Sequence, residues 1–240
     1  MYDFTGKTVL VTGGAVRVGA ALARAFDRAG ATVVIHCRHS VAAGEALLRE
    51  LSDRPHRLLA LDFGDPAQAD HLFDVVGVTV DILVNNASRY GRFSSVLAED
   101  TAGFQAFFQV NLFAPVSLMR QFARQLPTTA DGAVVNVLDQ ETAHAVPNGG
   151  AYALSRRALR DATLEFAREL APRIRVNGVA PGPVLPPVWL PESRMEKTLR
   201  RVPLGRPVGL DDLADAVLFL AGNRSVTGEI FGVDGGQHLG

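Results

Sequence analysis

The sequence predicts an α/β fold in which a parallel sheet is doubly wound, with helices on both of its faces. Short runs rich in Val, Ile and Leu alternate with longer stretches of helical periodicity along the whole chain. Continuous apolar strands are typical of strands buried on both faces, and regular strand–helix alternation is typical of βαβ units. Because 48% of the 240 residues are hydrophobic and no linker or repeat interrupts the pattern, we expect a single domain over residues 1–240.

About seven strands are predicted, with helical segments between them. The strands are expected over residues 7–12, 32–36, 57–62, 81–86, 133–138, 174–180 and 229–234. The helices are expected over residues 16–29, 41–52, 66–76, about 101–125, 150–171 and 211–221. The segment 181–209 is irregular and holds seven of the thirteen prolines, although its middle has a helical pattern. Long irregular segments in compact domains often cover a binding site, so we expect this one to be a substrate lid.

Composition excludes several functional classes. The chain has 24 basic and 25 acidic residues, so its net charge of −1 gives no general attraction to nucleic acid or to an anionic membrane. The single cysteine, Cys37, excludes an internal disulfide and fits a reducing compartment. No apolar run approaches the roughly 20 residues that span a bilayer. Neither a signal peptide nor metal-ligand spacing is recognisable. We therefore expect a cytoplasmic protein with a small-molecule substrate and no metal.

A glycine-rich turn follows the first predicted strand, in VTGGAVRVGAALARAF (11–26). Gly13 and Gly19 lie where the backbone must bend tightly and approach a pyrophosphate, which would rest on the helix N-terminus. Glycines also occur in ordinary turns, so the turn alone is weak. Its position directly after the first strand of an alternating chain favours a dinucleotide site.

The end of the second strand, HCRHS (36–40), indicates which dinucleotide would bind. An NAD site usually has an acidic residue here for the ribose 2′-hydroxyl, and this sequence has none. Arg38, His39 and Ser40 instead offer a cation and hydrogen-bond donors suited to a 2′-phosphate, although a solvated basic loop is the alternative. The sequence thus favours NADPH/NADP. Asp62, at the end of the third strand, could accept a hydrogen bond from the adenine amino group.

A tyrosine and an arginine share one face of the predicted helix 150–171. Tyr152 and Arg156 are four residues apart, so their side chains lie one above the other. A cation beside a phenol favours the phenolate, so we expect Arg156 to activate Tyr152. On a surface helix the same pair would be unremarkable. Its place directly after the fifth strand makes it a candidate for the active site.

Together these features resemble the short-chain dehydrogenases/reductases over essentially the whole chain. The signatures are TGGAVRVG (12–19), NNAS (85–88), VNLFAP (110–115), the tyrosine with its cation, PGPV (181–184) and VTGEIFGVDGG (226–236). The resemblance implies a Rossmann-type sheet of seven strands, NAD(P)(H) as cofactor and a homotetramer packed through the helices at 101–125 and 150–171. The residues expected to contact the cofactor are Gly13, Arg17, Val18, Gly19, His36, Arg38, His39, Ser40, Asp62, Phe63, Asn86, Ala87, Ser88, Tyr152, Arg156, Pro181, Gly182 and Val184.

The family has an Asn, Ser, Tyr and Lys tetrad, and this chain departs from it twice. The asparagine and tyrosine fall on Asn111 and Tyr152, whereas the serine position is Asp139 and the lysine position is Arg156. Arginine keeps the positive charge and can reach ribose hydroxyls, but it does not readily release a proton. Structural alternatives remain open: Asn111 could bond only to backbone or water, and Asp139 could cap the following segment.

The aspartate makes the chain similar to pteridine reductases and the related dihydromonapterin reductases. Those proteins also have an arginine in the first turn, here Arg17, and an aromatic residue after NNAS, here Tyr90. The resemblance implies an NADPH-dependent reductase that adds a hydride to a pterin C=N carbon, with the proton delivered by Tyr152 and Asp139. Substrate contacts are then expected from Arg17, Ser88, Tyr90, Asp139, Tyr152 and Trp189.

Two other functions remain open. The chain could reduce a ketone or a 3-oxoacyl thioester, although an ionised Asp139 would repel a carbonyl oxygen. It could also be a non-catalytic NADP(H)-binding sensor or scaffold, which the replacement of lysine by Arg156 would favour.

Overall fold

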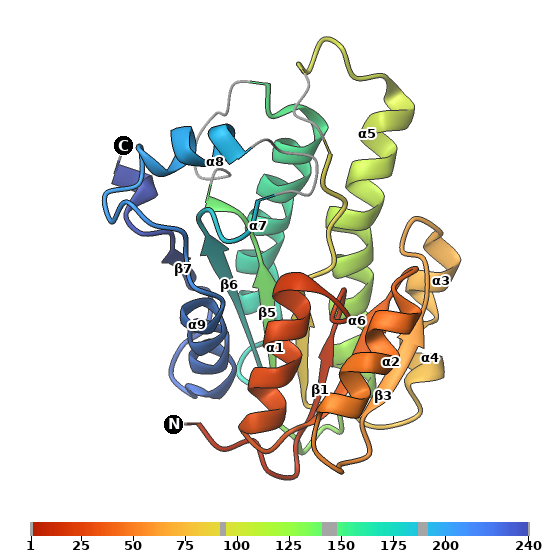
Figure 1. Ribbon diagram of the computed structural model, residues 1–240. Helices are drawn as coiled ribbons and strands as arrows, with labels where there is room; N and C mark the ends of the chain where they lie inside the picture. Colours follow the sequence, from red (N-terminus) through yellow and green to blue (C-terminus); the bar gives the residue numbers. More distant parts are fainter. Residues whose placement is uncertain (1, 92–94, 141–147, 187–191, 240) are drawn as a thin grey trace.

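A seven-stranded parallel sheet forms the centre of the molecule, with helices on both faces (Figure 1). The computed structural model describes residues 2–91, 95–140, 148–186 and 192–239. The strand order is β3-β2-β1-β4-β5-β6-β7. The strands are β1 (Thr8–Val11), β2 (Thr32–Cys37), β3 (Arg57–Ala60), β4 (Ile82–Asn85), β5 (Gly132–Val137), β6 (Ile174–Pro181) and β7 (Ile230–Val233). The predicted doubly wound fold and its seven strands are confirmed.

The helices form one layer on each face of the sheet. Side chains of α1 (Arg17–Arg28), α2 (Val41–Glu50) and α9 (Leu210–Gly222) pack into one apolar core. The opposite core receives side chains from α3 (Pro66–Asp70), α4 (Leu72–Val76), α6 (Ala114–Gln125) and α7 (Gly150–Leu170). Since both faces are covered, residues of the central strands β1 and β4 are almost completely buried, as their continuous apolar sequences predict.

Two of the predicted helices are interrupted. The helix expected over 66–76 is divided into α3 and α4 at His71, and Asp65 caps α3 by accepting a hydrogen bond from the backbone N–H of Ala67. The helix expected over 101–125 consists of α5 (Thr101–Phe108), a π-helical turn η1 (Gln109–Phe113) and α6. A π-helical turn widens the backbone locally and often occurs at functional sites. In the proline-rich segment, the expected helical middle is α8 (Glu192–Leu199).

The order of the strands defines where a ligand can enter. The chain runs outward from β1 to β2 and β3, and then returns to the other side of β1 to form β4. The connections after β1 and β4 therefore leave the sheet in opposite directions, which opens a crevice at the carboxyl ends of these two strands. Among the described residues, no helix combines the length and apolar character needed to cross a membrane.

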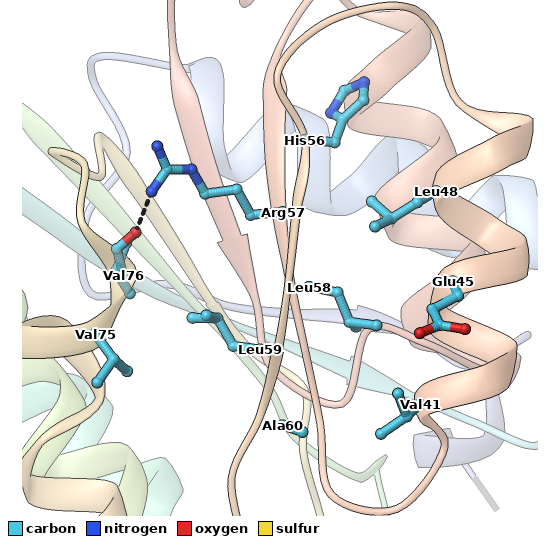
Figure 2. Close-up of a pocket in the computed structure, with 10 residues that line it drawn as sticks. All are labelled: Val41, Glu45, Leu48, His56, Arg57, Leu58, Leu59, Ala60, Val75 and Val76. Atoms are coloured by element: carbon cyan, nitrogen blue, oxygen red, sulfur yellow. Dashed lines mark hydrogen bonds between the residues drawn. The ribbon is translucent and has the colours of Figure 1, made fainter.

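At the amino ends of the strands, opposite the crevice, several arginine side chains bind backbone carbonyl oxygens at the C-termini of helices. Arg57 donates to the carbonyl oxygen of Val76 at the end of α4, at 2.9 Å (Figure 2). Arg173 donates to carbonyl oxygens at the end of α6, and Arg175 to those at the end of α9. Arg54 reaches the last turn of α1. These guanidinium groups satisfy carbonyls that have no partner within their own helix and complement the negative end of the helix dipole.

A surface hollow of about 520 Å³ lies along the outer strand β3, between α2 and α4 (Figure 2). Its lining combines apolar side chains such as Leu48 and Leu58 with the polar side chains of Glu45, His56 and Arg57. Two strands separate it from β4. None of the residues predicted to contact cofactor or substrate lines this hollow, so it is separate from the β1–β4 crevice.

Candidate active site

The glycine-rich turn is packed tightly against the end of β4. Gly13 has a φ of 61°, a left-handed conformation that favours glycine. A Cβ atom on Gly19 would lie 2.1 Å from the carbonyl oxygen of Gly13. Asn86 fixes the turn, because its side-chain amide donates to the carbonyl oxygens of Thr12 and Gly13 at 2.9 and 3.1 Å. Helix α1 then begins without a side-chain cap, so its first N–H groups are available to an anion.

His36, a buried residue of β2, supports this turn from the interior of the protein. The backbone N–H of Gly13 donates to its Nδ1 at 3.2 Å, and its Nε2 lies 3.0 Å from the carbonyl oxygen of Leu61. Its ring also stacks on the ring of Phe63, with the two ring centroids 4.0 Å apart. Burial lowers the pKa of the His36 imidazole from 6.5 to about 4. A neutral ring with the proton on Nε2 satisfies both contacts, so His36 and Phe63 shape the turn from the interior.

Basic and polar groups gather beside the turn at the end of β2. Arg38 and His39 are exposed and Ser40 is partly exposed, as a site for a 2′-phosphate requires. The Arg38 guanidinium lies 4.0 Å from the carboxylate of Asp62, which also accepts a hydrogen bond from the backbone N–H of Gly64. This places Asp62 beside the exposed cation.

Arg17 connects the glycine-rich turn to the proline-rich segment. Its φ of 53° is unusual for a residue with a side chain. The guanidinium donates to the carbonyl oxygens of Leu185 and Pro186 at 3.2 and 3.0 Å. At the start of the same segment, Gly182 packs so closely on Asp234 that an added Cβ atom would lie 2.8 Å from the Cα atom of Asp234.

The remaining predicted cofactor contacts lie around this crevice. Val18 and Val184 both pack against the core that contains α1. Ala87 follows Asn86, and its backbone N–H donates to the Thr12 hydroxyl at 3.0 Å. Pro181 is the last residue of β6.

Asn111 joins three parts of the site. It lies in the π-helical turn and is fully buried. Its side-chain oxygen accepts hydrogen bonds from the Ser88 hydroxyl and the Arg89 backbone N–H, at 3.2 and 2.8 Å. Its amide donates to the Arg89 carbonyl oxygen and to the Ser155 hydroxyl, at 3.1 and 3.0 Å. The wider π-helical turn thus places one polar side chain between the segment after β4 and helix α7.

Tyr152 and Asp139 are in direct contact. The Tyr152 hydroxyl donates to the Asp139 carboxylate at 2.6 Å, across 13 residues of sequence. Asp139 follows the end of β5, and Tyr152 lies in the first turn of α7. The spacing that aligns Asp139 with the serine of the family therefore also brings the two side chains together.

The net effect on the Tyr152 hydroxyl is opposite to the sequence-based expectation. Burial raises the pKa of Tyr152 well above its usual value of 10.0, and the Asp139 carboxylate raises it further. Arg156 lowers that pKa, as predicted, but its effect is outweighed. The expectation considered the cation without the burial of the phenol. At neutral pH the hydroxyl is protonated, which suits a proton donor.

Arg156 is buried with much of its guanidinium unused. It is 3% exposed, and its Nη2 group donates to the carbonyl oxygen of Val137. Its Nε and Nη1 groups are buried without a hydrogen-bond partner among the described residues. Unpaired buried donors are costly, so this arrangement fits a ligand that supplies acceptors, such as the hydroxyl groups of a nucleotide ribose.

Aromatic side chains surround the phenol. The rings of Tyr90 and Tyr152 meet edge to face, with their centroids 4.9 Å apart. Phe107 contacts Tyr152 in the same way at 6.3 Å, and the Arg89 guanidinium lies over the Phe107 ring. Trp189, the predicted cover of the substrate, lies outside the described residues.

The sequence did not single out Phe107, Arg89 or Ser155 for the site. Ser155 lies three residues after Tyr152 on the same helix face, which was an available signal. Phe107 and Arg89 had none, because their places depend on contacts between separate segments.

Comparisons with known proteins agree with this geometry. A family model described as enoyl-(acyl carrier protein) reductase matches residues 14–238. The L-xylulose reductase of Homo sapiens is 34% identical over 239 residues, covering 96% of each chain. The crystal structure of FolM alternative dihydrofolate reductase 1 from Brucella canis, complexed with NADP, is 36% identical. It has a TM-score of 0.91 over 99% of this chain and 96% of that one.

A further structure carries the name of the family. It is described as a short chain dehydrogenase/reductase family protein and is 32% identical, with a TM-score of 0.86. It covers 99% of this chain and 100% of that chain. Together with the glycine-rich turn, the strand order and the buried tyrosine–arginine pair, these similarities show that the chain belongs to the short-chain dehydrogenase/reductase superfamily.

Proposed function

We propose that the protein is an NADPH-dependent reductase of a pterin-type substrate, such as a dihydropteridine, a dihydromonapterin or a dihydrofolate-like ring. The observation that carries this proposal is the 2.6 Å hydrogen bond between Tyr152 and Asp139. A carbonyl oxygen needs a neutral donor beside the tyrosine, whereas a pterin has ring nitrogens and an amino group that suit an acid–base pair. The similarity to an alternative dihydrofolate reductase supports the same substrate class.

The residues of the crevice favour NADPH over NADH. Arg38, His39 and Ser40 offer donors to a 2′-phosphate, and no carboxylate lies among residues 36–40 to repel it. The unpaired donors of Arg156 match the nicotinamide ribose. Bound NADPH supplies the hydride.

The protein residues would then manage the proton. Tyr152, which is protonated at neutral pH, donates its hydroxyl proton to the ring nitrogen of the reduced C=N bond. Asp139, already hydrogen-bonded to that hydroxyl, would orient it and could pass on a solvent proton that replaces the one transferred. Arg156 stabilises the transient phenolate, because it is the group beside Tyr152 that favours the charged form.

The surroundings of the site complete the proposal. In this proposal Tyr90 would stack on the flat ring, and Arg17 and Ser88 would contact polar groups of substrate and cofactor. The segment 181–209 would be the substrate lid, and Arg17 binds it at the carbonyl oxygens of Leu185 and Pro186. The exposed side chains of Phe113, on η1, and of Leu154 and Leu164, on α7, offer apolar surface for the expected homotetramer.

The test is the loss of nicotinamide absorbance when purified protein is mixed with NADPH and dihydropterins. Turnover of a dihydropterin supports the proposal. Turnover of ketones alone would favour a carbonyl reductase, a function suggested by the similarity to L-xylulose reductase. In that case Asp139→Ser should keep or increase ketone reduction. Tight NADPH binding without turnover on either panel would favour a sensor or scaffold.

A further inference from the structure

The backbone of Arg89 is held in place by the buried part of the site. Its N–H donates to the side-chain oxygen of Asn111 at 2.8 Å, and its carbonyl oxygen accepts from the Asn111 amide at 3.1 Å. Asn111 is itself fully buried and bonded to Ser155. Two hydrogen bonds to one rigid side chain fix both the position and the direction of the Arg89 backbone, although the residue lies at the surface.

The guanidinium of Arg89 is placed one aromatic ring away from the phenol. It lies 5.4 Å from the centre of the Phe107 ring, and Phe107 contacts the ring of Tyr152. The aromatic face stabilises the cation and limits where it can lie. Arg89 is exposed, and no carboxylate among the described residues forms an ion pair with it. Its donors are therefore accessible from solvent, beside an aromatic ring that contacts Tyr152.

We propose that Arg89 is a specificity-determining residue, which binds an anionic group on the side chain of the substrate. The ligand is a flat heteroaromatic ring whose substituent ends in a carboxylate or a phosphate. This inference rests on the proposed function and deepens it, because it selects among pterins by the charge of their substituent.

The charge distribution of the site supports this role. The Asp139 carboxylate lies at the phenol and repels an anionic substrate. A cation one ring away offsets that repulsion only for a substrate with its negative charge at the far end of the substituent. Arginine also presents a planar fork that matches both carboxylate and phosphate oxygens. Arg156 is buried at α7, so it does not serve this purpose.

The experiment compares matched substrates in the wild type and in Arg89→Gln. The phosphate arm is dihydroneopterin phosphate against dihydroneopterin, and the carboxylate arm is dihydrofolate against its diamide. In the pair that contains the recognised anion, Arg89→Gln should raise KM for the anionic substrate about tenfold. The kcat of that substrate and the KM of its neutral counterpart should change little. The KM of Arg89→Lys for the anionic substrate should lie between those of the wild type and Arg89→Gln. Added salt should raise KM for the anionic substrate in the wild type and have little effect in Arg89→Gln.

The control is Arg168→Gln, which removes an exposed cation from the last turn of α7, far along the helix from Tyr152. It should leave both members of each pair unchanged. If Arg89 only supports the packing of Phe107, its substitution will affect neutral and anionic substrates equally, and the inference is wrong. A response in one arm alone identifies the anion as phosphate or carboxylate.

Failure of the proposed function gives a different result. If the wild type reduces no dihydropterin, the same comparison is made with 4-acetylbenzoate and its methyl ester. A preference for the acid that disappears in Arg89→Gln would preserve the anion site while the pterin assignment fails. Equal KM values for the acid and the ester, or no reduction of either, would overturn the anion site as well.

Discussion

The Tyr152 hydroxyl donates a 2.6 Å hydrogen bond to the carboxylate of Asp139, and both groups lie at the carboxyl edge of the sheet. A carboxylate beside a buried phenol holds the phenol proton more tightly than a hydroxyl would, because ionisation would create two adjacent negative charges. The pair is therefore suited to deliver a proton and poorly suited to remove one at neutral pH.

Substitution of Asp139 by Asn should lower the pKa of Tyr152. The change removes the negative charge but keeps a hydrogen-bonding side chain. A reductase needs the protonated phenol, so its activity is present below the pKa of Tyr152 and lost above it. In Asp139→Asn, kcat/KM should begin to decrease at a lower pH than in the wild type. Its plateau for a dihydropterin should fall about 100-fold. An unchanged alkaline limb would show that Asp139 does not control the phenol.

Arg156→Met should separate cofactor binding from folding. The guanidinium is buried with two of its donor groups unused among the described residues, so an apolar side chain of similar length should leave the ligand-free Tm unchanged or higher. Affinity for NADPH, measured by calorimetry, should fall at least tenfold because the ribose contacts are lost. Arg156→Lys is the matched control and should keep most of the affinity. A large gain in rate in Arg156→Lys would instead show that the native site is compromised.

Arg38→Gln should weaken NADPH binding more than NADH binding. The lost contact is a charge-assisted hydrogen bond to the 2′-phosphate, and the side chain is 51% exposed. The Kd for NADPH should therefore rise by roughly tenfold or less, with little change for NADH. Equal losses for both nucleotides would indicate that Arg38 supports the loop rather than the phosphate.

His36 should make the free energy of unfolding depend on pH. Burial lowers the pKa of its imidazole from 6.5 to about 4, so the unfolded chain binds a proton more readily than the folded one between these values. The contribution is complete above pH 6.5 and is lost as the pH falls toward 4, by about 3 kcal/mol in total. Urea titrations at several pH values should show this decrease in the free energy of unfolding in the wild type and not in His36→Asn. His71→Asn, at an exposed position, should retain it.

The sequence was sufficient to predict the strands and a crevice beside the end of β4. Alternation of apolar strands with helices requires only local periodicity, and the glycine-rich turn follows directly after β1. The π-helical turn at Asn111 was not predicted, because it depends on contacts with Arg89 and Ser155 from other segments. A continuous helix over 101–125 was the expectation that periodicity alone allowed.

The sequence predicted which residues form the candidate site better than it predicted their electrostatics. The family spacing brought Asp139 to Tyr152, but the direction of the pKa shift depends on how deeply the phenol is buried, which sequence neighbours do not reveal. The cation–aromatic contact of Arg89 with Phe107 is also invisible in sequence, since 18 positions separate a residue that follows β4 from one within α5.

The arginine contacts with helix ends lie at the edge where the strands begin, whereas the tyrosine, its aspartate and the crevice lie where the strands end. Layer attachment and chemistry are thus carried by residues at opposite poles of the same sheet. If Arg89 and Tyr90 select the substrate as proposed, sequence drift around them would redirect the enzyme to new substrates while the helices stay attached to the sheet. One scaffold can in this way host many specificities.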